Sequence, residues 1–232
     1  MTLLLRDRLE GDLVIEVAFT GSTLDVGDRA EASARAAALA VVAAETAAEP
    51  VLMHQVHGAE VAVVPGPGSG DTAPPSCDAL VTTEAGVALL ARAADCVPVL
   101  LGDPGAGVVA AVHSGRNGLV AGVVPSAVAR MRDLGARRIT AWMGPHVCGA
   151  CYEVPEEMRA EVAAVVPESW ATTRWDTPGL DLGAGVRAQL DRAGVEQLHD
   201  VAVCTLEDDA WPSHRRDGAA ATRFAGVVWM PA

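Results

Sequence analysis

The residues best suited to chemistry in this sequence are Cys96 and His113, which flank a predicted β-hairpin. Two apolar runs, 97–101 and 108–112, are rich in valine and leucine, and the stretch between them has the glycine and proline content of a turn. If the last residue of the first run pairs with the first residue of the second, the antiparallel register places Cys96 opposite His113. Their Cβ atoms would then lie about 4.5–5.5 Å apart.

A thiol and an imidazole at this separation suit three roles. They can share a zinc ion, because zinc bonds measure about 2.3 Å to sulfur and about 2.0–2.1 Å to nitrogen. They can form a nucleophilic dyad, in which Cys96 attacks a substrate and His113 is its base. They can also be ordinary interior residues, since most free cysteines are buried thiols. The hairpin alone leaves these alternatives open.

Two further histidines, His54 and His57, lie in a segment that precedes a predicted strand. In an extended chain alternate residues share a face, so His54 and His57 would point to opposite sides and only one of them would face a given site. The spacing by itself connects neither histidine to Cys96. Asp95, next to Cys96, is the nearest carboxylate in the sequence.

Two other motifs combine residue types that bind ligands. Cys148 and Cys151 have the CxxC spacing of redox and zinc sites, although neither a second CxxC nor a thioredoxin-like sequence accompanies them. Arg215 and Arg216 stand in a turn-rich stretch. They form either surface ion pairs or a clamp for an anion, because guanidinium groups bind phosphate through paired hydrogen bonds.

The composition restricts the class of protein. With 17 basic and 30 acidic residues, the 232-residue chain has a formal charge of −13, which opposes binding to nucleic acid or to an anionic membrane. The sequence has no signal-peptide pattern and no apolar run of membrane-spanning length, and its five cysteines are an odd number. We therefore expect a cytoplasmic, monomeric protein with a single domain over residues 1–232.

The regular elements follow from hydrophobic pattern and turn residues. Only 3% of the residues are aromatic, so Ala, Val and Leu must fill the core, which favours closely packed sheets and helices. Besides the hairpin, strands are predicted at 12–19, 59–64, 77–82, 139–143, 201–205 and 224–230. Helices are predicted at 28–47 with Asp28 as N-cap, at 119–134 with a break at Pro125, at 155–166 and at 181–192.

Six short blocks occur in the order found in a known family. They are 55–58 (QVHG), 78–82 (DALVT), 94–99 (ADCVPV), 111–115 (AVHSG), 144–145 with 151–154 (GP and CYEV), and 215–218 (RRDG). Through these blocks the chain resembles, from about residue 51 to residue 224, the multicopper polyphenol oxidase or laccase-domain family. Members of that family are regarded as purine nucleoside phosphorylases with adenosine deaminase activity.

The resemblance implies a metal site and a fold. The family's ligands, two histidines and one cysteine, correspond to His57, Cys96 and His113. Three protein ligands leave one position open, as in catalytic zinc sites. Zinc is the expected metal, with copper as the alternative. The implied fold is α/β (α+β), a single layered domain with mixed β-sheets flanked by helices.

The resemblance also implies substrates and the residues near them. The implied reactions are phosphorolysis of adenosine, inosine, guanosine or methylthioadenosine to base and sugar 1-phosphate, and deamination of adenosine to inosine. Purine nucleosides and phosphate are therefore the expected partners. Asp95 and Asp78 are the expected catalytic carboxylates. The residues expected to bind substrate are Gln55, Arg92, Arg116, Arg215 and Arg216. Arg116 and Asn117 depart from the Trp-Arg pair usual in the family.

Other functions compete with this one. A true multicopper laccase builds its cluster from His-x-His pairs, and the six histidines of this sequence include no such pair. A single blue-copper site would need a methionine, Met53 or Met143, beside the two histidines and the cysteine. A metal-free hydrolase would use Cys96 as its nucleophile. A purely structural metal would bind without turnover.

Overall fold

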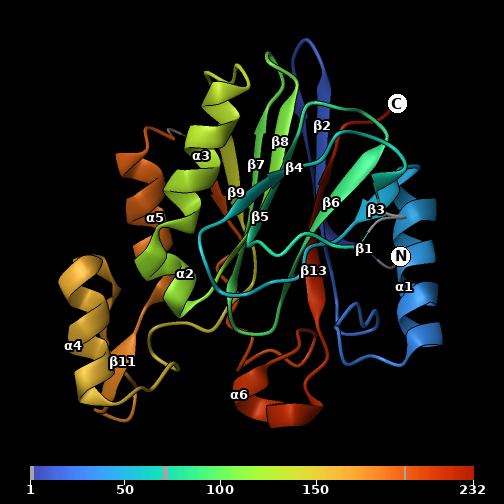
Figure 1. The fold of residues 1–232 in the computed structure, drawn as a ribbon. Coiled ribbons are helices and arrows are strands. Elements are labelled where there is room, and N and C mark those ends of the chain that lie inside the picture. Colours follow the sequence, from blue (N-terminus) through green and yellow to red (C-terminus); the bar gives the residue numbers. More distant parts are fainter. Residues whose placement is uncertain (1–2, 70–72, 196) are drawn as a thin grey trace.

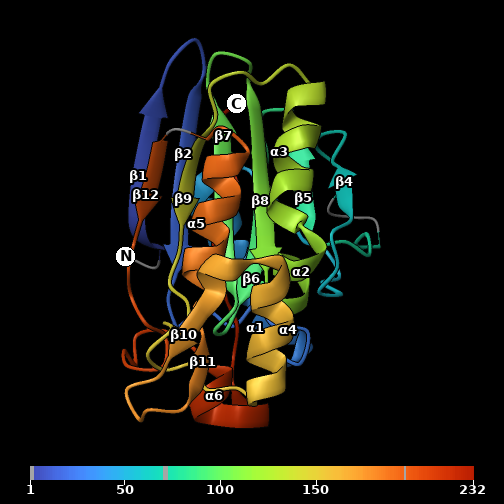
Figure 2. The ribbon, with the colours of Figure 1, turned by 90° about the vertical axis from the view of Figure 1, so that its left-hand side faces the viewer.

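The computed structural model describes residues 3–69, 73–195 and 197–232. Two β-sheets lie face to face, and helices cover their outer faces (Figures 1 and 2). The helices are α1 (Ala32–Thr46), α2 (Arg116–Ala121), α3 (Val123–Asp133), α4 (Glu156–Val165), α5 (Leu182–Arg192) and α6 (His214–Asp217). None of the helices in these ranges is long and apolar enough to cross a bilayer.

The first sheet has five strands and the second has six. The order in the first is β1 (Leu3–Glu10), β2 (Val14–Thr20), β13 (Phe224–Trp229), β6 (Val87–Ala93) and β3 (Glu49–Val51). The order in the second is β12 (Gln197–Asp200), β9 (Thr140–Met143), β7 (Val97–Asp103), β8 (Val108–Ser114), β5 (Ala79–Thr82) and β4 (Val61–Val63). Both sheets contain parallel and antiparallel pairs, which confirms the predicted fold class.

Apolar side chains fill the layers between these elements. One cluster lies between the two sheets, a second lies between the second sheet and α3 with α5, and a third lies between the first sheet and α1. Phe19 of β2 is one of the aromatic side chains in the cluster between the two sheets, and it packs against Gly144 and Gly226. A Cβ atom on Gly226 would lie 3.0 Å from its ring, so the absence of a side chain there makes room for Phe19.

The β7–β8 hairpin is present, but its predicted register is wrong by two residues. Leu101 pairs with Ala110, and Pro98 pairs with His113. Strand β7 continues to Asp103, so the turn is shorter than predicted. The Asp103 carboxylate accepts hydrogen bonds from the amides of Gly105 (3.0 Å) and Ala106 (3.2 Å) within that turn. Because side chains alternate with a period of two, this shift keeps every residue on its predicted face.

Two other predicted elements also differ. The run 201–205 is not a strand: the strand parallel to β9 is β12, which precedes it, and residue 204 makes only an isolated bridge to His146. β12 is an edge strand that is exposed or half-buried, so its sequence lacks an apolar pattern. Helix α1 begins at residue 32 with Glu31 as its N-cap, because the Asp28 carboxylate bonds Arg92 instead.

The β2 strand generates a stability prediction. Phe19→Ala should lower the free energy of unfolding by about 3–5 kcal/mol, since the two sheets cannot close over the cavity that the ring leaves. Leu13→Ala, at a side chain that is 50% exposed, is the matched control and should change stability by less than about 0.5 kcal/mol. Urea denaturation of both variants measures the difference, and equal losses would contradict the assignment of Phe19 to the inter-sheet core.

Candidate active site

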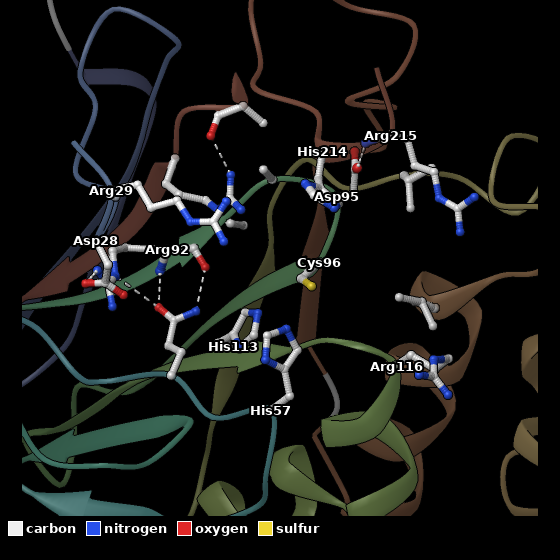
Figure 3. Close-up of a pocket in the computed structure, with 18 of the residues that line it drawn as sticks. Asp28, Arg29, His57, Arg92, Asp95, Cys96, His113, Arg116, His214 and Arg215 are labelled. Atoms are coloured by element: carbon white, nitrogen blue, oxygen red, sulfur yellow. Dashed lines mark hydrogen bonds and ion pairs between the residues drawn. The ribbon is translucent and has the colours of Figure 1, made fainter. Parts of the chain in front are cut away.

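His57, Cys96 and His113 meet at the open end of the β7–β8 hairpin (Figure 3). Cys96 directly precedes β7, His113 lies in β8, and His57 comes from the loop between β3 and β4. The ligand atoms of the three side chains all lie within 4.8 Å of one another. The two imidazole rings are nearly perpendicular, with their centroids 4.8 Å apart.

The carboxylate of Asp78 positions His57. One oxygen accepts the amide of His57 at 3.0 Å, and the other accepts the amides of Val56 (3.1 Å) and Gly58 (2.7 Å). The chain thus turns around Asp78, with His57 at a φ of +60°. This region is uncommon for a residue with a side chain. The alternation predicted for His54 and His57 does not apply, because the segment is not extended.

Asp78 also orients His113. Its Oδ1 lies 2.8 Å from Nδ1 of His113, which directs the other ring nitrogen away from Asp78. Burial raises the pKa of Asp78, but the hydrogen bonds to His113 and the loop amides outweigh this effect, and the net pKa is lower than usual. The carboxyl is therefore ionised. Asp78 is completely buried and does not line the cavity described below. Its contacts are those of a positioning residue.

Gly115 leaves the space that the triad needs. A Cβ atom at this position would lie 2.9 Å from Sγ of Cys96 and 2.9 Å from Cδ2 of His57. Any side chain would therefore push the thiol and the imidazole apart. The sequence analysis did not single out Gly115 as a site residue, although it belongs to the 111–115 block.

The triad is electrostatically coupled. Burial alone raises the pKa of the Cys96 thiol, but the charge of His113 and hydrogen bonds from both imidazoles lower it to about 6. Burial lowers the pKa of His113, whereas the Cys96 thiolate and Asp78 raise it to about 9. Without a metal the pair is thus a thiolate and an imidazolium at neutral pH.

The donor set fits a metal ion. One thiolate and two imidazoles suit zinc or copper, and a carboxylate behind a ligand histidine is the usual arrangement at such sites. Met53 and Met143 pack in the core clusters and are not among the described residues that line the cavity. The structure therefore gives no support to the methionine that the blue-copper alternative needs.

A cavity of about 620 Å³ opens beside the triad. Residues from distant parts of the chain form its walls, among them Arg29, Arg116, Tyr152, His214 and Arg215. In Figure 3, Arg29 lies on one side of the triad, and Arg116 and Arg215 lie on the other. The sequence analysis missed Arg29, Tyr152 and His214 as wall residues. Only Tyr152 carried a signal, since it belongs to the 151–154 block.

Gln55 and Arg92 line the cavity but bind each other. The Gln55 amide donates to the Arg92 carbonyl (2.9 Å) and accepts from the Arg92 amide (3.0 Å). The Arg92 guanidinium is 3% exposed and bonds the Met53 carbonyl (2.7 Å) and the Asp28 carboxylate. This arrangement fixes the wall and leaves the Arg92 charge balanced by Asp28.

The two neighbouring arginines of the predicted anion clamp have different surroundings. The Arg215 guanidinium lies 4.7 Å from the centre of the Tyr152 ring and faces the cavity. The Arg216 guanidinium donates to the carbonyls of Thr205 (2.9 Å) and Trp211 (2.9 Å) and pairs with nearby carboxylates. Arg216 is not among the described residues that line the cavity. This geometry assigns Arg216 to the loop structure and does not support phosphate binding by it.

Asp95 lines the cavity at a φ of +84°. Its Oδ1 accepts the Thr205 hydroxyl at 2.7 Å, and its Oδ2 accepts the Arg215 amide at 2.7 Å. Its own carbonyl accepts the Val147 amide at 3.0 Å. Asp95 therefore connects the start of β7 to the loop that carries Tyr152 and to α6, which carries Arg215. Its predicted catalytic role stays a prediction.

The comparisons with known proteins identify the family and agree with this fold. Residues 11–231 match the family model described as multi-copper polyphenol oxidoreductase laccase, so the chain belongs to that family. A purine nucleoside phosphorylase of Streptomyces coelicolor is 59% identical over 182 residues, which are 78% of this chain and 74% of that protein. A purine nucleoside phosphorylase of Mycobacterium bovis is 46% identical over 205 residues, which are 88% of this chain and 81% of that protein.

A solved structure supports the same relationship. The crystal structure of YlmD from Geobacillus stearothermophilus matches with a TM-score of 0.84 and 28% sequence identity, covering 94% of this chain and 92% of that one. The family resemblance predicted from the six sequence blocks is confirmed.

The coupling within the triad predicts how Cys96 reacts. In protein stripped of metal by a chelator, alkylation of Cys96 by iodoacetamide should rise with pH around a midpoint near 6, because the thiolate is the nucleophile. Cys77, whose pKa burial raises to about 11, is the internal control and should not react. Peptide mass spectrometry measures both rates.

Alkylation in the presence of added zinc distinguishes a metal-binding thiol from a metal-free nucleophile. Zinc should suppress alkylation of Cys96, since a metal-bound sulfur is shielded. Fast alkylation that zinc does not slow would favour the metal-free cysteine hydrolase.

Proposed function

We propose that this protein is a metal-dependent purine nucleoside phosphorylase that also deaminates adenosine. In this proposal adenosine, inosine, guanosine or methylthioadenosine is split by phosphate into a base and a sugar 1-phosphate. Support comes from the relatives named purine nucleoside phosphorylase and from the chemistry of the cavity. The observation that carries the proposal is a set of arginines without acidic partners beside the triad.

Those arginines are Arg29, Arg116, Arg215 and Arg223. Each lines the cavity, and none makes an ion pair with a carboxylate within the described parts of the chain. In a protein with a formal charge of −13, unpaired guanidinium groups that line one cavity favour an anionic ligand. Phosphate is a suitable size and charge, and a cavity of about 620 Å³ also has room for a nucleoside.

Phosphorolysis requires phosphate to approach C1′ of the sugar with its negative charge offset. A phosphate oxygen forms a bond to C1′ of the sugar while the bond from C1′ to N9 of the purine breaks, and the electron pair leaves with the base. The arginines hold the phosphate and offset its charge during the attack. The Tyr152 ring, beside the Arg215 guanidinium, presents a flat, polarisable surface against which a purine can stack.

Deamination requires water and a proton carrier. A water oxygen adds to C6 of adenosine and ammonia leaves, so a proton must move from the water to the departing nitrogen. We assign this transfer to Asp95, because it lines the cavity next to Cys96. A divalent metal ion held by His57, Cys96 and His113 would supply Lewis acidity that polarises an oxygen at the site. Asp78 keeps two of these side chains in place.

The products formed with and without phosphate test the proposal. Zinc-loaded protein should convert inosine to hypoxanthine and ribose 1-phosphate only when phosphate is present, because phosphate is the attacking group. Adenosine should yield inosine in either condition, since that reaction consumes only water. Chromatographic separation of bases and nucleosides measures both. Absence of every product from zinc-loaded protein would overturn the proposal.

The arginine assignment is tested within the same assay. Arg116→Ala and Arg215→Ala should each raise the KM for phosphate about tenfold or more, because a hydrogen bond to a charged group contributes about 1.5–3 kcal/mol. Arg130→Ala, on α3 and outside the cavity, removes the same charge as a control. An unchanged phosphate KM in both cavity variants would place the anion elsewhere.

A second prediction concerns Asp95. Asp95→Asn should retain zinc but reduce kcat for deamination by at least about 10²-fold, the lower range for loss of a general acid or base. The control is Thr205→Val, which removes one hydrogen bond to Asp95 and leaves the carboxylate in place. If Asp95 only positions the loops, both variants should instead raise KM with little change in kcat or in its pH profile.

A further inference from the structure

A second cluster of metal-binding side chains lies outside the triad. Cys148, Cys151, Cys204 and Glu207 offer three sulfur atoms and a carboxylate oxygen, all within 4.8 Å of one another. The four residues come from two loops, one after β9 and the other after β12, which are more than 50 residues apart in the chain. None of the three cysteines forms a disulfide in the structure.

Two similar turns present these side chains. In the first, the Cys148 carbonyl accepts the amides of Cys151 (2.9 Å) and Tyr152 (3.0 Å). In the second, the Cys204 carbonyl accepts the amides of Glu207 and Asp208, both at 3.1 Å. Each turn therefore brings the side chains of its first and fourth residues to one side. A CxxC turn thus faces a CxxE turn, and together they supply the four ligands of a closed tetrahedral site.

Backbone contacts hold the two turns together. The His146 amide donates to the Val203 carbonyl (3.1 Å), and the Thr205 amide donates to the His146 carbonyl (3.1 Å). The Cys148 amide donates to Sγ of Cys204 at 3.4 Å, a contact that stabilises negative charge on that sulfur. The cluster is thus fixed by main-chain hydrogen bonds and does not depend on side-chain rotamers alone.

One positive side chain, Arg174, lies beside the cluster. Arg174, in the loop after β10 (Trp170–Thr172), lies 2.6 Å from Sγ of Cys151 and 2.5 Å from the Glu207 carboxylate. Once a divalent ion has displaced the thiol protons, three thiolates and a carboxylate would carry four negative charges, of which this guanidinium offsets one. A divalent ion among the sulfurs would leave a net charge of −2, and Arg174 would then balance half of it from the second shell.

We propose that Cys148, Cys151, Cys204 and Glu207 bind a structural zinc ion separate from the triad. Four protein ligands leave no open position, so this site holds the fold and takes no substrate. A disulfide is the competing chemistry, but it would engage only two of the three cysteines. Zinc accounts for all of these residues.

The cluster lies next to residues that form or position the wall of the active-site cavity. Tyr152, directly after the first turn, forms the cavity wall with Arg215. Thr205, within the second turn, donates its hydroxyl to Asp95. β10, β11 (Pro178–Leu180) and α6 gather at this same end of the molecule (Figures 1 and 2). The zinc ion would fasten together the loops that close the active-site cavity.

Metal content tests the proposal. Full-length protein purified under reducing conditions and loaded with zinc should contain about two zinc ions per chain by elemental mass spectrometry. Cys148→Ser and Cys204→Ser should each reduce this to about one, as should His57→Ala at the triad. Cys77→Ser, a buried cysteine outside both clusters, is the matched control and should retain both. Binding of one zinc ion that only the triad variants remove would overturn the proposal.

Cobalt substitution in a chain whose three cysteines are intact keeps the test decisive if a cysteine variant fails to fold. Thiolate-to-cobalt absorption grows with the number of bound sulfurs. The His57→Ala variant, with only the three-cysteine site occupied, should absorb about three times as strongly per cobalt as a site with one thiolate. Absorption equal to a single thiolate, or a disulfide among the three cysteines in the zinc-loaded protein, would refute the second site.

Discussion

The buried carboxylate of Asp78 is the interaction on which the triad depends. It accepts three backbone amides from the loop around His57 and bonds the ring of His113, so one charge organises two elements that are far apart in sequence. A buried carboxylate without such donors would be costly, and these hydrogen bonds offset the desolvation. His57 is held in a left-handed conformation because Asp78 bonds the amides on both sides of it.

Two kinds of structural element form the rest of the site around Asp78. Strands β7 and β8 supply a rigid base, with every residue of both strands buried. Much of the cavity wall comes instead from loops and the short helices α2 and α6, and Asp95 joins part of it to the base through Thr205, Arg215 and Val147. Rigid strands and loops held in place suit the proposed function, in which two substrates are held in one orientation.

Several features of the site could be predicted from the sequence, and particular residues explain the limits. Cys96 and His113 were recognisable because the hairpin pattern places them together, and a register error of two residues does not change a face. His57 required the family resemblance, since its positive φ depends on Asp78, which is distant in sequence. Arg29 had no local signal, because the fold alone brings it to the cavity.

For the fold, too, local sequence patterns could be predicted, and features that depend on tertiary structure could not. Buried strands such as β8 have a continuous apolar sequence, whereas β12 is a polar edge strand that pattern analysis assigned to the wrong residues. The three-cysteine cluster was visible in sequence only as an isolated CxxC, because its other half, Cys204 and Glu207, joins it through tertiary structure.

The position of β13 constrains how the chain reaches this structure. β13 follows every other strand in the sequence, yet it lies in the middle of the first sheet, between β2 and β6. During synthesis β2 and β6 therefore emerge from the ribosome before the strand that joins them, with unpaired edges and an apolar face exposed. The nascent chain has to stay unaggregated over that interval, and the first sheet closes only after nearly all of the described chain has been translated.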